Sequence, residues 1–185
     1  PISLEWLRQC PYVVCCDGAA NTYIRSGRMP EAIVGDGDSL LPDIKERYAS
    51  LIHSEAEQET NDLSKAFRFC LSQERKRITI MGATGKREDH TIGNVSLLAD
   101  YMEQAEVSMM TDYGIFVPIR EDSMFESYIG QQISVFNMNS TALSAEGLAY
   151  PLSVFTNWWQ GTLNEALARH FIIRTEGKVL VFRVF

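Results

Sequence analysis

Residues 12–39 read YVVCCDGAANTYIRSGRMPEAIVGDGDS. An apolar run opens this stretch, an amphipathic segment follows and stops at Gly27, and a second apolar run, AIVG, occupies residues 32–35. This order is typical of a strand–helix–strand unit, and the runs RITIM at 77–81 and EVSMM at 106–110 repeat it. We therefore predict a Rossmann-like α/β domain with a largely parallel sheet, and helices over residues 19–26, 43–49, 61–72 and 91–104.

The pattern changes after residue 113. Short apolar or alternating runs at 115–119, 132–136, 170–174 and 179–184 are separated by turn-like segments, without a long amphipathic stretch. This texture indicates a C-terminal antiparallel β-sandwich or half-barrel, of which we predict the sandwich. We predict two domains, residues 1–114 and 115–185.

Composition excludes several partner classes. The 185 residues hold 17 Lys and Arg against 24 Asp and Glu, a formal net charge of −7. Binding to nucleic acid or to an anionic membrane depends on phosphate neutralisation by basic residues, so we expect neither partner. No apolar run approaches a membrane span, and the first residues, PISLEWLRQC, lack a signal-peptide pattern. The four cysteines form no CxxC pair, and we expect reduced core thiols in a cytoplasmic protein.

Carboxylates follow the predicted strands of the first half. Asp17 follows YVVCC, Asp36 and Asp38 follow AIVG, Asp62 lies in the first turn of a helix, and Asp89 follows RITIM. The carboxyl ends of parallel strands open onto one crevice, so most of these acids should converge. Two carboxylates about 4 Å apart repel by roughly 4 kcal/mol at an effective dielectric of 20, so a cation is expected among them.

The donor set points to a hard cation. All-oxygen ligands without nearby His or Cys favour Mg²⁺ or Mn²⁺ over zinc. For any single Asp, an ordinary role as a helix cap or turn residue explains the position equally well. The convergence of the whole set is what favours a metal site.

The loop GATGKREDH at residues 82–90 is a second candidate site. Its glycines let backbone amides approach a ligand, and Lys86 and Arg87 add positive charge just before a helix, which suits phosphate. The spacing is not that of a Walker A motif. Taken alone, the loop is equally compatible with a solvated turn, but beside a metal-binding acid cluster it suggests a nucleotide polyphosphate.

We expect most of the remaining candidate residues to have structural roles. His53 lies at the end of a predicted strand and His170 at the start of another, which favours structural roles for both. For His90 a structural and a functional role are equally compatible with the sequence. Of Trp158 and Trp159, we expect at least one in the core of the β half, although either could stack on an aromatic ligand.

Six short motifs, in order along nearly the whole chain, resemble those of the thiamine pyrophosphokinase family. DGAAN at 17–21 resembles the family's DGGAN, GDGDS at 35–39 its GDFDS, and QETND at 58–62 its QDxTD. Residues 82–94 resemble GGxxGRxDHxxxN. In the second half, GLAYPL at 147–152 resembles GLxYxL, and GTLNE at 161–165 resembles GTSNE.

The resemblance implies an ATP- and Mg²⁺-binding catalytic domain over residues 1–114 and a thiamine-binding and dimerisation β-sandwich over 115–185. It implies a homodimer with thiamine bound at the subunit interface. The implied reaction moves the β,γ-pyrophosphoryl group of ATP to the hydroxyethyl oxygen of thiamine and releases AMP and thiamine diphosphate. Mg²⁺ on a polyphosphate is what this chemistry requires.

Site residues follow from the matching motif positions. By the resemblance, Asp36, Asp38 and Asp62 hold Mg²⁺, with Mn²⁺ as an alternative, and Asp89 completes the catalytic acids. The group that accepts the hydroxyl proton is left open, with an aspartate of the cluster as our hypothesis. The implied thiamine contacts are Thr162, Leu163 and Asn164. The implied ATP and phosphate contacts are Asp17, Gly18, Ser39, Gln58, Asn61, Lys65, Gly82, Thr84, Gly85, Lys86, Arg87, His90 and Asn94.

Four positions depart from the family's motifs. Ala19 replaces the second Gly of DGGAN, Gly37 the aromatic residue of GDFDS, Asn61 the Thr before the Asp, and Leu163 the Ser of GTSNE. The family's opening strand, with its Asn-Gly turn and a phosphate contact, is also not found before Pro1. Leu163 invites an alternative acceptor such as a hydroxymethylpterin. A non-catalytic module that senses nucleotide or thiamine diphosphate is the second alternative.

Overall fold

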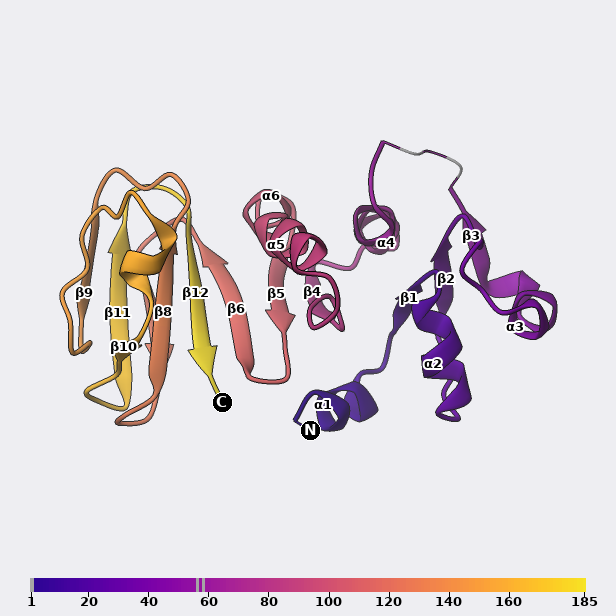
Figure 1. The fold of residues 1–185 in the computed structure, drawn as a ribbon, viewed down its shortest axis with the longest axis horizontal. Helices are drawn as coiled ribbons and strands as arrows, with labels where there is room; N and C mark the ends of the chain where they lie inside the picture. The colour runs from indigo at the N-terminus through magenta and orange to yellow at the C-terminus, as the bar shows by residue number, and fades with distance from the viewer. Residues whose placement is uncertain (1, 56, 58) are drawn as a thin grey trace. The chain divides into compact units, whose positions relative to one another are not determined.

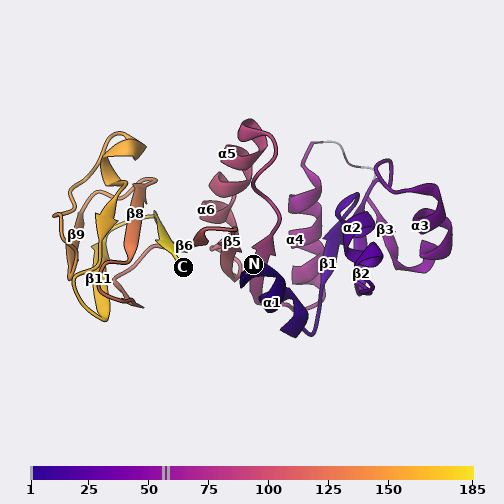
Figure 2. The same ribbon diagram turned by 60° about the horizontal axis from the view of Figure 1, so that its bottom comes forward.

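A computed structural model describes residues 2–55, 57 and 59–185, with side chains from Glu5 onward. It divides the chain into two compact units, residues 2–76 and residues 77–185, which we call the first and the second unit. Figures 1 and 2 label the elements of both.

The first unit is an α/β unit with a three-stranded parallel sheet. Strand β2 (Ala32–Gly35) lies between β1 (Val14–Cys16) and β3 (Ile52–Ser54), with Cys16 paired to Val34 and Gly35 to Ser54. Its helices are α1 (Ile2–Gln9), α2 (Ala19–Arg25), α3 (Pro42–Arg47), the 3₁₀ helix η1 (Ala49–Leu51) and α4 (Asp62–Ser72).

Both faces of β2 are buried. Ile33 packs in a cluster with Ala20 of α2 and Ile44 of α3, whereas Ala32 and Val34 pack in another with Ala66 of α4. Figure 2 shows α4 on one side of the sheet and α2 and α3 toward the other. A central parallel strand covered on both faces is expected to be continuously apolar, which explains the run AIVG.

The second unit contains a six-stranded sheet in the order β10-β8-β12-β6-β5-β4 and a three-stranded sheet in the order β7-β11-β9. In the larger sheet β4 and β5 are parallel and the other pairs are antiparallel. Figure 1 shows β12 between β6 and β8. The elements are β4 (Arg77–Met81), α5 (Glu88–Ser96), α6 (Leu98–Tyr101), β5 (Glu106–Met110), β6 (Gly114–Ile119), β7 (Ser123–Glu126), β8 (Gln132–Asn137), β9 (Leu143–Glu146), η2 (Trp158–Gly161), β10 (Asn164–Glu165), β11 (His170–Thr175) and β12 (Val179–Val184).

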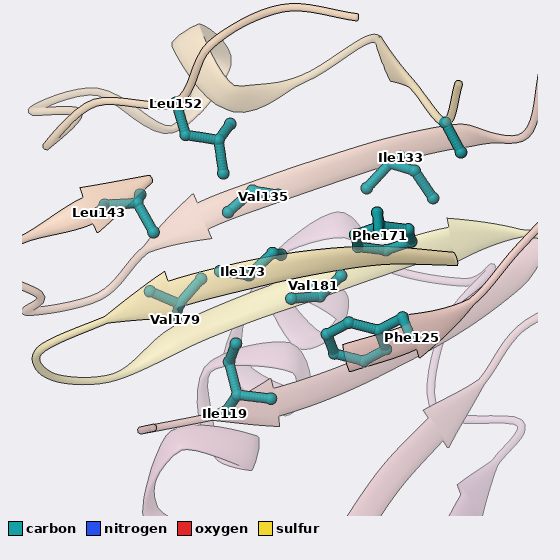
Figure 3. Packing of buried hydrophobic residues seen from close by; sticks show 11 residues of the cluster. Ile119, Phe125, Ile133, Val135, Leu143, Leu152, Phe171, Ile173, Val179 and Val181 are labelled. Carbon is teal, nitrogen blue, oxygen red and sulfur yellow. The ribbon is translucent and has the colours of Figure 1, made fainter. Parts of the chain in front are cut away.

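The core of the second unit lies between its two sheets. Figure 3 shows side chains of β8 and β12 packed together with those of β7, β9 and β11. Phe125 and Phe171 stack with ring centroids 5.1 Å apart. Burying side chains of this size contributes about 2 to 3 kcal/mol each, so this layer is the main apolar stabilisation of the antiparallel part.

The predicted helices and most predicted strands are present, with specific differences. The helix expected over 91–104 begins at Glu88 and is divided into α5 and α6. Parallel pairing occurs in two places, β1-β2-β3 and β4-β5, of which the second continues into the antiparallel strands. The elements α1, β7, β9 and β10 are not among the predicted ones. Strands β7, β9 and β10 have four residues or fewer and one buried residue each, which is too short for a recognisable pattern.

The boundary predicted at residues 114 and 115 lies within the six-stranded sheet, where β5 pairs with β6. The compact units instead meet between residues 76 and 77. A functional division near residue 114 stays a prediction. Among the helices of the described chain, none has the length and apolar character needed to cross a bilayer.

Candidate active site

Three carboxylates meet at the carboxyl ends of β1 and β2. Asp17 follows β1, and Asp36 and Asp38 follow β2, its parallel neighbour. Each offers a carboxylate oxygen, and these oxygens all lie within 4.8 Å of one another. Asp17 is buried, whereas Asp36 and Asp38 are exposed, so the cluster has a closed base and an open side.

Asp17 is held tightly at the base. Its backbone N–H donates to the Val34 carbonyl at 2.9 Å, and its Oδ2 accepts from the Ser39 N–H at 3.1 Å. Gly35 lies directly against it, because a Cβ there would be 2.7 Å from the Asp17 Cβ. The other oxygen, Oδ1, is buried and has no hydrogen-bond partner among the described residues. A buried unpartnered carboxylate oxygen is costly, and a cation would satisfy it.

Burial raises the pKa of Asp17, and the charges of Asp62 and Asp36 raise it further, while the Ser39 hydrogen bonds lower it. A carboxyl whose folded-state pKa is raised binds its proton more tightly in the folded state than in the unfolded state. Its contribution to stability is therefore present at acidic pH and is lost as the pH rises through the folded pKa.

We expect Asp17→Asn to raise the melting temperature at pH 7 in the presence of EDTA, because the amide removes a buried charge and keeps an acceptor for Ser39. The gain should shrink as the pH falls through the raised folded-state pKa of Asp17 and should be absent below about 4, where the carboxyl is protonated in the unfolded chain as well. Melting curves of both chains from pH 3 to pH 8 measure this. A difference that does not change with pH would contradict it.

The loop at residues 35–39, which we call the acid loop, organises the two exposed carboxylates. Asp36 Oδ1 accepts from the Asp38 N–H at 3.1 Å, and Asp38 Oδ1 accepts from the Ser39 hydroxyl at 3.0 Å. Gly37 has φ +75°, in the left-handed region that favours glycine. The structure thus presents two carboxylates on one turn, with oxygen donors suited to a hard cation.

Asp62 opens α4 and is bound to a buried lysine. Asn61 caps the helix, its side chain accepting from the Ser64 N–H at 2.9 Å. Lys65 Nζ lies 3.3 Å from Asp62 Oδ1, with 3% of the Lys65 side chain exposed against 38% for Asp62. The Asp62 charge raises the pKa of Asp17, but Asp62 is not among the three carboxylates whose oxygens lie within 4.8 Å of one another, so its place in the metal site stays a prediction. Lys65 acts here as an internal counter-charge, and its predicted phosphate contact stays a prediction.

Cys16 lies beside this cluster, and its environment makes it a neutral thiol. Burial above all, then the neighbouring Asp62 charge, raises its pKa to about 12. Burial likewise raises the pKa of Cys15 to about 12. The expectation of core thiols is wrong for Cys10, which is exposed because α1 leaves it at the surface. All four cysteines are free.

The segment before α4 is tied to that helix by Arg68. Its guanidinium pairs with Glu55 at 2.9 Å and Glu57 at 3.1 Å, and it donates to the Thr60 hydroxyl at 3.2 Å. Gln58, a predicted ATP contact, lies outside the described residues.

The glycine loop at residues 82–87 belongs to the second unit and joins β4 to α5. Gly82 and Gly85 have φ +69° and +85°. The Asn94 side chain donates to the Ala83 carbonyl at 2.9 Å and so braces the loop from α5. The remaining predicted contacts of this region are Thr84, which is half-buried, and Lys86 and His90, which are exposed.

Asp89 forms a two-point ion pair with Arg87. Nε donates to Oδ1 at 3.1 Å and Nη2 to Oδ2 at 2.5 Å. The Arg87 bonds hold the pKa of Asp89 below its ordinary value. Asp89 lies in the second unit, whereas Asp17, Asp36 and Asp38 lie in the first, and its grouping with them stays a prediction.

The predicted thiamine residues lie on a braced turn between η2 and β10. The Thr162 hydroxyl donates to the Trp159 carbonyl at 2.7 Å. Asn164 is buried, and its side chain accepts from the Tyr150 N–H at 3.0 Å and donates to the Tyr150 carbonyl at 2.8 Å. Leu163 has φ +63° and is 74% exposed. Leu163 therefore presents an apolar side chain to solvent, while Thr162 and Asn164 hold the turn.

The prediction that one tryptophan lies in the core is wrong. Trp158 is 43% exposed and Trp159 74% exposed. Trp158 contacts Phe136 edge to face, with ring centroids 6.0 Å apart. Both rings belong to η2, whose last residue, Gly161, packs so closely on β8 that a Cβ would lie 1.8 Å from the Val135 carbonyl oxygen. His53 lies in β3 with its ring centroid 4.5 Å from that of Phe69, and His170 begins β11, so both positions are as predicted, while their structural roles stay predictions.

Sequence reasoning missed Lys45, whose Nζ donates to the Gly37 carbonyl at 2.8 Å. A signal was available, since a lysine in the helix directly after GDGDS is within reach of that loop. Reach alone, however, does not distinguish it from Arg47, the other basic residue of α3.

Comparison with known proteins assigns the chain to a family. The family model described as thiamin pyrophosphokinase, catalytic domain, matches residues 4–110, and that described as thiamin pyrophosphokinase, substrate-binding domain, matches residues 114–182. The chain belongs to the thiamin pyrophosphokinase family. The matched ranges cover the acid loop, the glycine loop and the turn that carries Leu163.

Relatives carry the same family name. The chain is 30% identical over 129 residues to thiamine pyrophosphokinase 1 of Oryza sativa subsp. japonica, covering 56% of this chain and 49% of the relative. It is 34% identical over 86 residues to thiamine pyrophosphokinase of Bacillus subtilis (strain 168), covering 44% and 40%. The chain spans about half the length of the curated relatives it matches.

Solved thiamin pyrophosphokinase structures share the fold. The enzyme from Geobacillus thermodenitrificans matches with a TM-score of 0.81 at 22% identity, covering 99% of this chain and 91% of that one. The enzyme from Bacillus subtilis matches with a TM-score of 0.80 at 21% identity, covering 94% and 87%.

Proposed function

We propose that the protein is a thiamine pyrophosphokinase, which transfers the β,γ-pyrophosphoryl group of ATP to the hydroxyethyl oxygen of thiamine. The observation that carries the proposal is the convergence of Asp17, Asp36 and Asp38 at the ends of two adjacent parallel strands, in a chain of this family. The products are thiamine diphosphate and AMP.

The acid cluster fits a divalent cation. Its donors are all oxygens, and the buried, unpartnered Oδ1 of Asp17 gives the cluster an unmet need for positive charge. We propose that Asp36, Asp38 and Asp62 hold Mg²⁺, or Mn²⁺ in its place, with Asp17 behind them. The bound cation would neutralise charge on the polyphosphate and orient it for displacement.

Side chains of the protein itself would carry out the proton transfer and the positioning that the reaction needs. The thiamine hydroxyl oxygen forms a bond to the β-phosphorus of ATP, and the bond from that phosphorus to the α,β-bridging oxygen breaks, so AMP leaves with that oxygen. We propose that an aspartate of the cluster accepts the hydroxyl proton, since these are the acids that the fold gathers. Catalysis of phosphoryl transfer is mostly positioning and charge stabilisation, which a braced acid loop supplies.

The nucleotide contacts follow the motif positions. The glycines of the 82–87 loop allow close backbone approach to a phosphate, and α5 begins directly after it. Arg87, oriented by Asp89, is preorganised for a phosphate oxygen. The full proposed set is Asp17, Gly18, Ser39, Gln58, Asn61, Lys65, Gly82, Thr84, Gly85, Lys86, Arg87, His90 and Asn94.

Thr162, Leu163 and Asn164 are the proposed thiamine residues, in a cytoplasmic homodimer whose thiamine site lies at the subunit interface. Support for their role comes from the exposed Leu163 on a rigid turn. A side chain held outward in a sparsely populated backbone conformation is typical of a binding residue.

AMP release from ATP and Mg²⁺, with and without thiamine, tests the proposal. We expect AMP to form only when thiamine is present. AMP formation with a hydroxymethylpterin but not with thiamine would reassign the acceptor, and ATP binding without AMP release would favour a sensing role. The comparisons favour neither alternative.

Leu163→Asn should separate stability from acceptor binding. A leucine in the left-handed region costs about 1 to 2 kcal/mol, which asparagine largely avoids, so the free energy of unfolding should rise by about 1 kcal/mol. The KM for thiamine should rise as well, because an apolar contact is lost. Denaturant unfolding and steady-state kinetics measure the two effects. Leu167→Asn, at another exposed leucine, is the matched control, and an equal stability change there would contradict the strain argument.

A further inference from the structure

The ammonium group of Lys45 contacts the backbone of the acid loop. It lies on α3, which follows that loop, and its Nζ donates to the Gly37 carbonyl at 2.8 Å. Gly37 stands between Asp36 and Asp38, the two exposed carboxylates of the cluster. The contact therefore holds an ammonium group at the backbone of the residue between these two proposed metal ligands.

The glycine at position 37 makes this contact possible. A Cβ at Gly37 would lie 3.3 Å from Lys45 Nζ and 3.5 Å from its Cε, so the lysine side chain extends along the bare backbone. The left-handed φ of Gly37 further disfavours a larger residue. Gly37, where the family's motif has an aromatic residue, and Lys45 thus form a matched pair in this chain.

We propose that Lys45 is a further substrate-binding residue, whose ammonium contacts the polyphosphate of the nucleotide at the acid loop. This inference rests on the proposed function. An ammonium has three N–H donors, and one of them is directed to the Gly37 carbonyl, so donors are left for phosphate oxygens.

The charge balance at the loop supports this role. Asp36, Asp38 and Asp62, the proposed metal ligands, carry more negative charge than a divalent cation offsets, so the negative charge of an ATP polyphosphate needs further cations. The two lysines associated with the cluster differ in access. Lys65 is buried against Asp62, whereas Lys45 is exposed and can be reached by a ligand from solvent.

Binding measurements on the full chain, without thiamine, test the assignment. We would titrate ATP with excess Mg²⁺ by calorimetry, and Mn²⁺ alone by electron paramagnetic resonance, into wild type, Lys45→Met and Lys45→Arg. We expect Lys45→Met to weaken ATP–Mg²⁺ binding about tenfold, the loss of roughly one charge-assisted hydrogen bond. Mn²⁺ binding should stay the same or tighten, because a neighbouring positive charge is gone, and Lys45→Arg should retain most ATP affinity.

The controls separate this inference from simpler explanations. Lys76→Met removes the same charge from another exposed site of the first unit and should leave ATP affinity unchanged. Equal ATP affinity in wild type and Lys45→Met would overturn the assignment of Lys45 alone. A loss of Mn²⁺ binding together with ATP binding would show that Lys45 only stabilises the conformation of the acid loop. This result would also overturn the assignment. A wild-type chain that binds no ATP–Mg²⁺ would overturn the proposed function together with this inference.

Discussion

Asp38→Asn is expected to lower thiamine-dependent AMP formation by about 100- to 1,000-fold, the usual loss when one preorganised charge contact is removed from a transition state. The asparagine keeps an oxygen that can accept from the Ser39 hydroxyl, which Asp38 now binds at 3.0 Å. It removes one negative charge from a cluster whose oxygens lie within 4.8 Å of one another. The melting temperature without metal should therefore stay the same or rise. Steady-state AMP assays and melting curves measure the two effects.

Asp43→Asn is the matched control, because Asp43 is an exposed aspartate in the first turn of α3, outside the cluster. Its activity should stay within about twofold of wild type, as is usual for a surface change away from a site. Full activity in Asp38→Asn would contradict the metal assignment. Loss of activity together with a large fall in melting temperature would instead point to a structural role for the carboxylate.

Asp62→Ala is expected to reduce the free energy of unfolding by about 2 to 3 kcal/mol. The Lys65 side chain is 3% exposed, and within the described chain its ammonium is paired with Asp62. Removing one partner of such a pair leaves a buried charge without compensation, which costs about 3 to 5 kcal/mol when both partners are buried. The partial exposure of Asp62 reduces this value. For a chain of this size the melting temperature should fall by about 4 to 12 °C.

Lys65→Met distinguishes charge from packing. Methionine keeps most of the apolar volume without the charge, so this change should be nearly neutral, and replacement of a buried ion pair by apolar residues is often tolerated. The double variant Asp62→Ala with Lys65→Met should recover most of the stability lost in Asp62→Ala. Additive losses in the double variant, measured by denaturant unfolding, would show that the pair does not account for the effect.

The sequence was informative where local pattern and topology agree. Strand β2 follows from its continuous apolar run, and α4 follows from the Asn61 cap and the apolar spacing behind it. The meeting of Asp17, Asp36 and Asp38 follows from the rule that parallel neighbours end at one edge. These features depend on residues close together in sequence or on a single topological rule.

Other features depend on long-range packing and could not be predicted. The burial of Lys65 has no signal in its helix, where a lysine three residues after an aspartate is ordinary surface chemistry. The exposure of Trp159 has no signal in the sequence around it, because the burial of a tryptophan depends on which distant segments pack against it. The left-handed backbone of Leu163 lies beside Asn164, whose side chain bonds the backbone of Tyr150, 14 residues earlier in the chain.

The continuous sheet from β4 to β12 has a consequence for cooperativity. The two family models meet between residues 110 and 114, yet the hydrogen-bonded ladder passes through that point, since Met109 pairs with Phe116 and Met110 with Ile115. A protein unfolds locally in contiguous cooperative blocks. These blocks follow hydrogen-bonded ladders such as this one rather than the boundaries of family models. The last two strands of the catalytic segment and the antiparallel strands after them thus constitute one thermodynamic block, and separating the segments at residue 112 would leave β5 with an unsatisfied edge.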